Sequence, residues 1–169
     1  MGILGLVKDR RSIRKFKKKT VSKQIVEKIL EVGRWAPSGL NNQPWRFMVL
    51  AGAEKEALAQ FTHYRNIIKG ANKVILVFLD KKASYNYEKD LMAIGACIQN
   101  MLLSIHSLGL GACWLGEILN QRSRLQKSLK LPGHLQLEAV VALGYPLSSA
   151  NKGRRRPLRN LLLRKNKLY

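Results

Sequence analysis

The stretch LMAIGACIQNMLLSIHSLGLGACWLG, residues 91–116, is the most apolar part of the chain and decides its fold. A membrane span needs about 20 predominantly apolar residues. Polar residues interrupt this stretch and glycines end it: Gln99, Asn100, Ser104, His106, Gly109 and Gly111. We therefore expect a buried helix over residues 87–108 of a soluble protein, followed by a turn and a strand over residues 112–115.

Helix and strand patterns alternate on both sides of this stretch. Ser22 is a suitable N-cap for an amphipathic helix that Pro37 and Gly39 terminate. Before the apolar stretch we expect a short N-terminal helix, helices over residues 22–35 and 54–60, and strands over residues 45–51 and 73–79, the second of them central. After it we expect a helix that Asn120 caps and that ends near Lys130, and a strand over residues 135–144. This order predicts an α/β or α+β protein with one sheet.

The charge is unusual: 31 lysines and arginines stand against 10 acids, which gives a net charge of +21. Much of it lies in residues 15–19 and 152–167. Such a charge favours phosphates, nucleic acid, acidic membrane surfaces or anionic substrates, but a solvated basic surface without a specific partner explains it equally well. Because no nucleic-acid-reading motif is recognisable, we expect at most nonspecific nucleic-acid binding.

The cysteines and histidines indicate no metal site. Cys97 and Cys113 lie in apolar surroundings, which is typical of buried free thiols in a reducing compartment, and we expect a cytoplasmic protein. No apolar run of the signal-peptide type follows Met1. His106 falls within an apolar helix and is expected to be a core histidine with satisfied nitrogens.

The segment DRRSIR, residues 9–14, combines three guanidinium groups with a hydroxyl. Arginine presents a planar fork of donors that matches phosphate oxygens, so the segment is a candidate phosphate site; a solvated basic loop is the alternative. A Rossmann dinucleotide site is not supported, because Gly109-Leu110-Gly111 leads into a strand and not into a helix.

Three further segments have compositions that suit a ligand site. RWAPSGLNNQPW, residues 34–45, forms a tight loop rich in amides, and the glycines of GLGACWLGE, residues 109–117, permit close backbone approach. GYP at residues 144–146 is followed by KGRRRPL at residues 152–158, a second arginine cluster. Taken singly, the first is equally compatible with an ordinary helix-to-strand connection and the last with a disordered basic tail, whereas the glycine segment favours an ordinary helix–strand turn.

Together, in this order and at these separations, the four segments resemble the landmarks of the nitroreductase family of flavoenzymes. The resemblance spans residues 8–158. It implies an α+β nitroreductase-like fold with a central, mostly antiparallel sheet flanked by helices. It also implies an interlocked homodimer that binds FMN at its interface. Residues 1–158 would form the FMN-binding domain, and residues 159–169 a basic tail able to wrap the partner subunit.

The resemblance also implies which residues bind the flavin. The phosphate, ribityl chain and pyrimidine side would be held by Arg10, Ser12 and Arg14, with a contribution from Arg11. A loop of the partner chain would supply Pro37, Ser38, Gly39 and Asn41. The isoalloxazine would lie along Trp114, Leu115 and Gly116, with a backbone N–H near N5. The phosphate site would be closed by Arg154 and Arg156, although three consecutive arginines leave this register open.

The activity implied is that of an FMN-dependent oxidoreductase. It would pass hydride from NADH or NADPH through flavin N5 to a small organic acceptor, a nitroaromatic, quinone or enone, by a ping-pong mechanism. No catalytic side chain and no membrane association are expected. The regions between residues 51 and 87 and between 116 and 135 are shorter than in larger members, so the same scaffold could serve as a dehydrogenase or a dehalogenase. A basic nucleic-acid or polyanion-binding protein is the more distant alternative.

Overall fold

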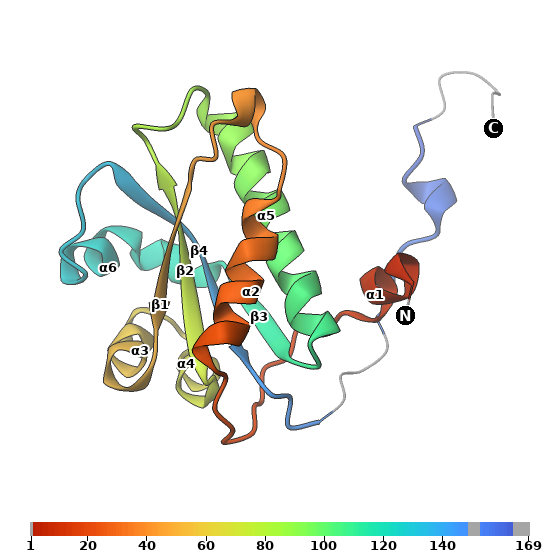
Figure 1. Ribbon diagram of the computed structural model, residues 1–169, viewed down its shortest axis with the longest axis horizontal. Coiled ribbons are helices and arrows are strands. Elements are labelled where there is room, and N and C mark those ends of the chain that lie inside the picture. The colour runs from red at the N-terminus through yellow and green to blue at the C-terminus, as the bar shows by residue number, and fades with distance from the viewer. Residues whose placement is uncertain (1, 149–152, 164–169) are drawn as a thin grey trace.

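A computed structural model describes residues 2–148 and 153–163, which form one antiparallel sheet between two layers of helices (Figure 1). The sheet has the strand order β1-β2-β4-β3. Its strands are β1 (Trp45–Leu50), β2 (Lys73–Asp80), β3 (Gly111–Leu115) and β4 (Leu135–Gly144). The α-helices are α1 (Ile3–Asp9), α2 (Lys23–Arg34), α3 (Gly52–Leu58), α4 (Arg65–Gly70), α5 (Tyr87–Ser107) and α6 (Arg122–Ser128). Short 3-10 helices are η1 (Gly39–Asn41), η2 (Ala59–Phe61), η3 (Glu117–Gln121) and η4 (Leu158–Asn160). This architecture confirms the expected α+β class.

The centre of the sheet consists of the two most apolar strands. β2 pairs with β1 on one side and with β4 on the other, and all three strand pairings are antiparallel. From Val74 to Leu79 every residue of β2 is buried, as expected for a strand that is apolar on both faces. β3 lies at one edge of the sheet, so its outer side is open to the N-terminal segment.

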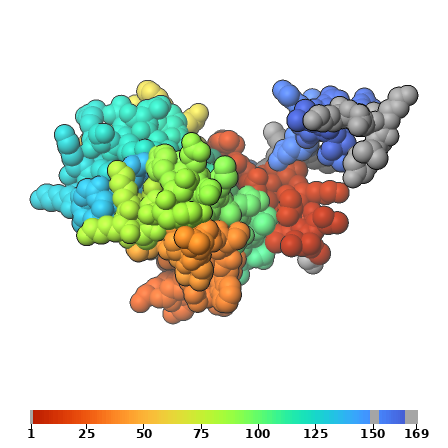
Figure 2. All heavy atoms as spheres, turned by 90° about the horizontal axis from the view of Figure 1, so that it is seen from above, coloured from red at the N-terminus to blue at the C-terminus, as the bar shows by residue number. Residues whose placement is uncertain are grey.

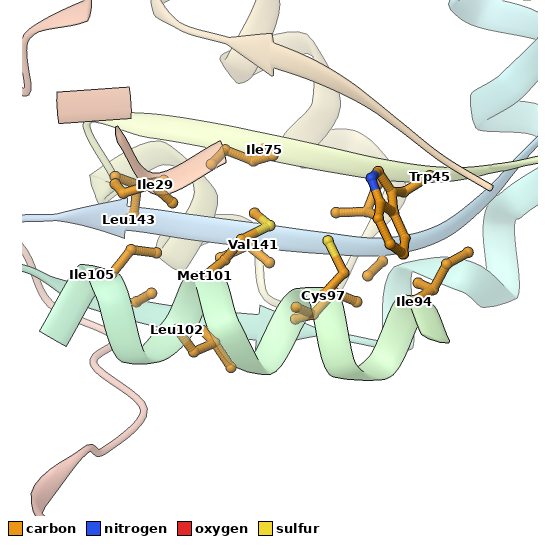
Figure 3. Close-up of a cluster of buried hydrophobic side chains, with 14 of the residues drawn as sticks. Ile29, Trp45, Ile75, Ile94, Cys97, Met101, Leu102, Ile105, Val141 and Leu143 are labelled. Carbon is orange, nitrogen blue, oxygen red and sulfur yellow. The ribbon is translucent and has the colours of Figure 1, made fainter. Parts of the chain in front are cut away.

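One face of the sheet is covered by α2 and α5, and their apolar stripes form the larger core (Figure 3). Ile29 of α2 meets side chains of α5 such as Cys97 and Met101, all of which are fully buried. Gly33 allows the two helices to approach closely, because a Cβ there would lie 2.6 Å from Cγ of Met101. Ser22 caps α2 as predicted, since its Oγ accepts from the Ile25 N–H.

The opposite face is covered by α3, α4 and α6, which enclose a second core. The buried Lys55 ends α4, because its Nζ donates to the carbonyls of Lys69 at 2.6 Å and Ala71 at 2.9 Å. The sequence did not predict α4, which has only two adjacent apolar residues and no helical period. The prediction that Asn120 caps the next helix was also wrong. Asn120 lies inside η3, and Gln121, at the N-cap position of α6, forms no side-chain capping hydrogen bond.

The N-terminal helix α1 and the described part of the C-terminal tail project together beyond one side of the body (Figure 2). α1 has no buried residue, and the leucines of the tail are exposed. None of the described helices combines the length and the apolar character of a membrane span. Residues 164–169 of the predicted basic tail and Lys152 lie outside the described residues.

Candidate functional site

The N-terminal arginine segment runs along the free edge of β3. Ser12 forms a parallel bridge with Ala112, and the Ile13 N–H donates to the Ala112 carbonyl at 2.8 Å. The approach requires glycine at position 111, because a Cβ there would lie 2.5 Å from Cγ1 of Ile13. Ser12 and its neighbours are therefore fixed against the strand that carries Trp114.

Arg10 and Arg14 flank Ser12 and act on the same buried thiol. Burial raises the pKa of Cys113, and the charges of Arg14 and Arg10 partly offset that rise. The pKa of Arg10 is itself lowered, first by partial burial and then by the charges of Arg11 and Arg155. Guanidinium groups from both ends of the chain thus share one region beside β3, where an anion would relieve their repulsion.

The C-terminal tail returns to these arginines. Gly153 lies directly on the Arg11 guanidinium, since a Cβ there would be 2.7 Å from Cζ of Arg11. The Arg11 side chain donates to the carbonyls of Lys8 and Arg10, where α1 ends. The Arg155 guanidinium, which donates to the Arg154 carbonyl at 2.8 Å, contributes its charge to the cluster. The two arginine segments that the sequence singled out are therefore brought together.

The sequence did not show which of the three tail arginines belongs to the cluster. Arg154 and Arg156 were selected there and are exposed on the described tail. Arg155 was left open as an alternative, and its charge contributes to lowering the pKa of Arg10. Three consecutive arginines contain no signal that separates one from the next, so only the path of the tail identifies Arg155 as a member of the cluster.

The end of β3 provides an open surface next to the arginines. The indole of Trp114 is 43% exposed, whereas the side chain of Leu115 points into the core and is 3% exposed. Gly116 is exposed, and a Cβ on it would find no atom within 4 Å. A flat ligand lying here could contact the ring of Trp114 and the backbone of the next two residues, but not the side chain of Leu115.

Glu117 connects this strand end to the loop before α4. Its Oε2 accepts from the buried Thr62 hydroxyl and from the His63 N–H, and its Oε1 lies 3.7 Å from Nε2 of His63. This cluster was not predictable from the sequence, because Glu117 and Thr62 are 55 residues apart and neither belongs to a recognisable spacing. The contacts hold the backbone that follows Gly116.

The loop with Pro37, Ser38, Gly39 and Asn41 is tightly constrained. Ser38 Oγ accepts from the Gln43 N–H at 3.1 Å, and Leu40, Asn41 and Gln43 all adopt positive φ angles of 46–55°. Left-handed backbone at non-glycine residues is strained and persists only where the surroundings impose it. Leu40 at the tip is 85% exposed. The loop therefore presents Leu40 and its neighbouring amides outward on a rigid frame.

Asp90 holds this loop in place through hydrogen bonds and was also not predictable as a functional residue from the sequence. It is fully buried in α5, where Oδ1 accepts from Asn42 Nδ2 at 2.8 Å and Oδ2 accepts from the Ser84 hydroxyl at 2.6 Å. The Tyr85 and Asn86 N–H groups also donate to Oδ2. Burial opposes ionisation of Asp90, but these hydrogen bonds outweigh it and lower the pKa of the carboxyl.

Within one chain, this loop and the arginine cluster lie at opposite ends of α5 (Figure 1). The loop is joined to the first turns of α5 through Asn42 and Asp90, whereas Ser12 pairs with β3 just after α5 ends. The 21 residues of α5 span about 30 Å. A single copy of the chain cannot present both groups to one small ligand.

A cavity of about 340 Å³ lies on the α5 side of the N-terminal segment. Asp9, Arg11, Ile13 and His106 are among its lining residues. Contrary to expectation, Nε2 of His106 is buried without a hydrogen-bond partner among the described residues. In the same part of the chain, no three His, Cys, Asp or Glu side chains are grouped to hold a metal ion, and both cysteines are buried and free.

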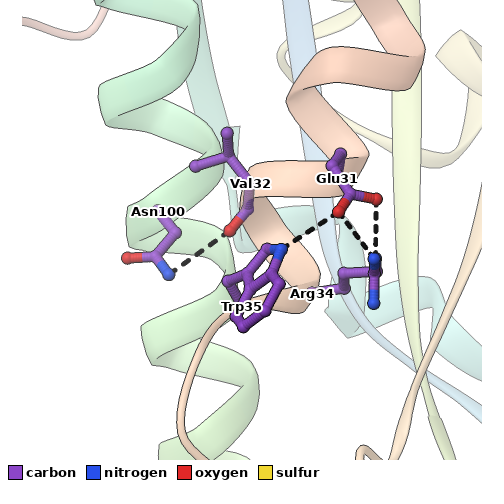
Figure 4. A network of polar contacts seen from close by, with 5 residues as sticks. All are labelled: Glu31, Val32, Arg34, Trp35 and Asn100. Carbon is purple, nitrogen blue, oxygen red and sulfur yellow. Dashed lines mark hydrogen bonds and ion pairs between the residues drawn. The ribbon is translucent and has the colours of Figure 1, made fainter.

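The outer surface of α2 and α5 carries uncovered apolar side chains beside a polar network (Figure 4). Glu31 accepts from Arg34 and from Nε1 of Trp35, and Nδ2 of Asn100 donates to the Val32 carbonyl at 3.4 Å. Although its N–H is satisfied, the Trp35 ring is 74% exposed. Further exposed apolar side chains on α1, η1 and α5 are Ile3, Leu4, Leu40 and Met92.

Comparison with known proteins relates this arrangement to flavoenzymes. The model of the nitroreductase family matches residues 7–65 and 60–145. A crystal structure from Desulfovibrio desulfuricans, provisionally named a nitroreductase and determined in complex with FMN, is 47% identical, with a TM-score of 0.94 over 98% of both chains. A protein of Archaeoglobus fulgidus, provisionally named an NADH dehydrogenase/NAD(P)H nitroreductase, is 34% identical over 85% of this chain and 84% of its own. The iodotyrosine deiodinase of Thermotoga neapolitana is 29% identical over 85% of this chain and 88% of its own.

Proposed function

Since the chain belongs to the nitroreductase family, we propose that it is an FMN-dependent NAD(P)H oxidoreductase acting on a small organic acceptor. FMN, when bound, supplies two-electron hydride chemistry between a nicotinamide donor and the acceptor, at one site used twice. The relative from Desulfovibrio desulfuricans, 47% identical over nearly the whole chain, is known in complex with FMN. The side chains of this protein need only bind, orient and electrostatically stabilise the cofactor.

The proposal rests chiefly on the meeting of the two arginine segments beside β3. Arg155 lies about 140 positions along the chain from Arg10 and Arg14. The pKa of Arg10 is lowered by partial burial and by the charges of its arginine neighbours. A phosphate monoester with two negative charges fits such a cluster, because guanidinium groups donate bidentate hydrogen bonds to its oxygens. Ser12 lies between Arg10 and Arg14 and adds a hydroxyl.

The ring system would lie over the end of β3. The exposed Trp114 indole and the open backbone at Gly116 provide a flat surface and an N–H donor. Arg14 on the adjacent segment would stabilise negative charge on the pyrimidine side of the reduced cofactor. Glu117, held by Thr62 and His63, would fix the backbone after Gly116 and so the direction of its donor.

The second half of the site would come from a second copy of the chain. Because the loop of residues 37–43 and the arginine cluster of its own chain lie at opposite ends of α5, whose 21 residues span about 30 Å, the loop can contribute only to the site of a partner. The uncovered apolar side chains of α1, α2 and α5, and the exposed Leu158, Leu161 and Leu163 of the tail, would be buried in the same dimer. Residues 1–158 then form the FMN-binding unit, and residues 159–169 the tail that lies on the partner.

The spectrum and mass of the ligand that co-purifies with the protein test this proposal. We expect yellow protein with flavin absorbance, release of a ligand with the mass of FMN on denaturation, and a dimer in solution. The double variant Arg10→Ala/Arg14→Ala should lose the colour, while Lys81→Ala/Lys82→Ala at the other end of the sheet should keep it. Wild-type protein that stays colourless after incubation with FMN would refute the assignment.

Dehalogenation is a second candidate acceptor reaction, favoured by the likeness to the iodotyrosine deiodinase of Thermotoga neapolitana. A steady-state screen with NADH and NADPH against nitroaromatics, quinones and enones separates the two. Turnover of any of these acceptors supports the reductase. Absence of turnover with either nicotinamide, combined with release of iodide from iodophenols under a chemical reductant, supports the dehalogenase.

A further inference from the structure

Four exposed lysines form a basic strip at one end of the sheet. This lysine strip, defined as Lys15, Lys17, Lys18 and Lys19, lies between the arginine cluster and α2. It is distinct from the residues proposed to bind FMN. Among the described residues, no carboxylate forms an ion pair with any of the four, whereas Lys23, just beyond, pairs with Glu27 at 3.6 Å.

The strip is rigidly held by backbone pairing with the chain that follows β4. The Lys17 N–H donates to the Tyr145 carbonyl at 2.8 Å, and the Leu147 N–H donates to the Lys15 carbonyl at 3.0 Å. Phe16 forms an antiparallel bridge with Pro146 and is buried. Nζ of Lys19 lies 4.2 Å from the centroid of the Tyr145 ring, and this cation–π contact also holds the side chain in place. The four charges are therefore concentrated on ordered backbone, and not on a free tail.

The described segments next to the strip contain no acid. Residues 10–26, 57–79 and 139–148 have neither aspartate nor glutamate, and the first of them carries 8 of the 31 lysines and arginines. Four acids lie at the other end of the sheet: Asp80, Glu88, Asp90 and Glu138. Glu54 and Glu56 of α3 follow the end of β1 that lies at the strip's end of the sheet, but neither forms an ion pair with the strip. The unpaired positive charge of the strip would orient an approaching polyanion towards the lysines.

We propose that the lysine strip is a binding surface for the phosphate backbone of nucleic acid, and thus a second, sequence-independent binding function of this protein. Lysines on ordered backbone match the phosphate contacts that supply nonspecific affinity. A membrane surface fits less well, because interfacial binding also requires apolar side chains to insert. Phe16 and Val21 of the segment are 9% and 1% exposed and face inward, and Leu147, which pairs with Lys15, adds a single exposed apolar side chain beside it.

The test uses FMN-loaded protein, so that the arginine cluster is occupied, and fluorescence anisotropy of a labelled DNA duplex of about 20 base pairs. We expect a Kd of about 1–100 µM near physiological salt, with log K falling linearly against log salt. The quadruple variant Lys15→Gln/Lys17→Gln/Lys18→Gln/Lys19→Gln should reduce the magnitude of that slope by up to about 3.6, since each phosphate contact contributes about 0.9.

The matched control removes the same charge from the opposite end of the sheet, in Lys81→Gln/Lys82→Gln/Lys127→Gln/Lys130→Gln. Its affinity and salt slope should stay close to those of wild type. Equal weakening by both variants, or no weakening by the strip variant, would overturn the proposal. Wild-type binding to phosphatidylserine vesicles that is lost in the strip variant, with no binding to DNA, would assign the strip to a membrane and would also overturn it. Circular dichroism and FMN content confirm that both variants are folded.

Discussion

The replacement Asp90→Asn tests whether one buried carboxylate holds the loop of residues 37–43 in its strained conformation. The asparagine has the same shape, but its amide nitrogen cannot accept a hydrogen bond. If the nitrogen takes the position of Oδ2, it faces the Ser84 hydroxyl and the N–H groups of Tyr85 and Asn86. If it takes the position of Oδ1, it faces the donating amide of Asn42. Either orientation leaves a buried donor unsatisfied.

The expected cost follows from these contacts. A hydrogen bond to a charged group contributes about 1.5–3 kcal/mol, and a buried donor without a partner costs about 1–3 kcal/mol. Because the Ser84 hydroxyl can rotate and Oδ1 or Oδ2 survives as an acceptor, part of the network is retained. We therefore expect the free energy of unfolding to fall by about 2–4 kcal/mol. Urea unfolding at one fixed protein concentration measures this change, since the stability of the proposed dimer would depend on concentration.

The pH dependence supplies an independent check. The pKa of Asp90 is lowered in the folded protein, so its contribution to stability is complete above the unfolded-state pKa of about 3.9. It is lost as the pH falls through the lower, folded pKa. Wild type should thus lose stability relative to Asp90→Asn in that acid range, and the two curves should converge. Glu27→Gln, which removes an exposed i,i+4 pair, should cost less than about 0.5 kcal/mol. A cost for Asp90→Asn no greater than that of Glu27→Gln would refute the reasoning.

Three further substitutions test other parts of the structure. Arg14→Ala should weaken FMN binding about 10- to 150-fold, the equivalent of one charge-assisted hydrogen bond, in a fluorescence titration; an unchanged affinity would remove Arg14 from the site. Arg155→Ala should weaken FMN binding to a similar extent, whereas Arg159→Ala, further along the tail, should have little effect. A larger loss for Arg159→Ala than for Arg155→Ala would show that Arg155 does not belong to the cluster. Gly33→Ala puts a Cβ 2.6 Å from Cγ of Met101 and should lower the free energy of unfolding, measured by thermal denaturation, by about 1–3 kcal/mol. In the double variant with Met101→Ala the two losses should not add, because the clash is removed. Full additivity would argue against the clash.

Much of the secondary structure was predictable because its signals are local. The cap Ser22 and the spacing of Val26 and Ile29 predicted α2, and continuous apolar runs predicted β2 and the bounds of β4. The prediction failed where the local signal was weak. α4 is a six-residue helix whose end depends on the distant Lys55, and the region after Gly116 contains two short helices in place of one.

The sequence by itself determined that the chain carries two arginine segments suited to binding phosphate, one near each end. Only the tertiary structure decided that they meet, since the pairing of Ser12 with Ala112 and of Phe16 with Pro146 brings residues about 100 and 130 positions apart into contact. The same holds for Asp90 and Asn42, and for the separation of the 37–43 loop from the arginines by the length of α5. Periodicity and capping act within a few turns of chain, whereas a binding site depends on long-range strand and helix packing that no local pattern encodes.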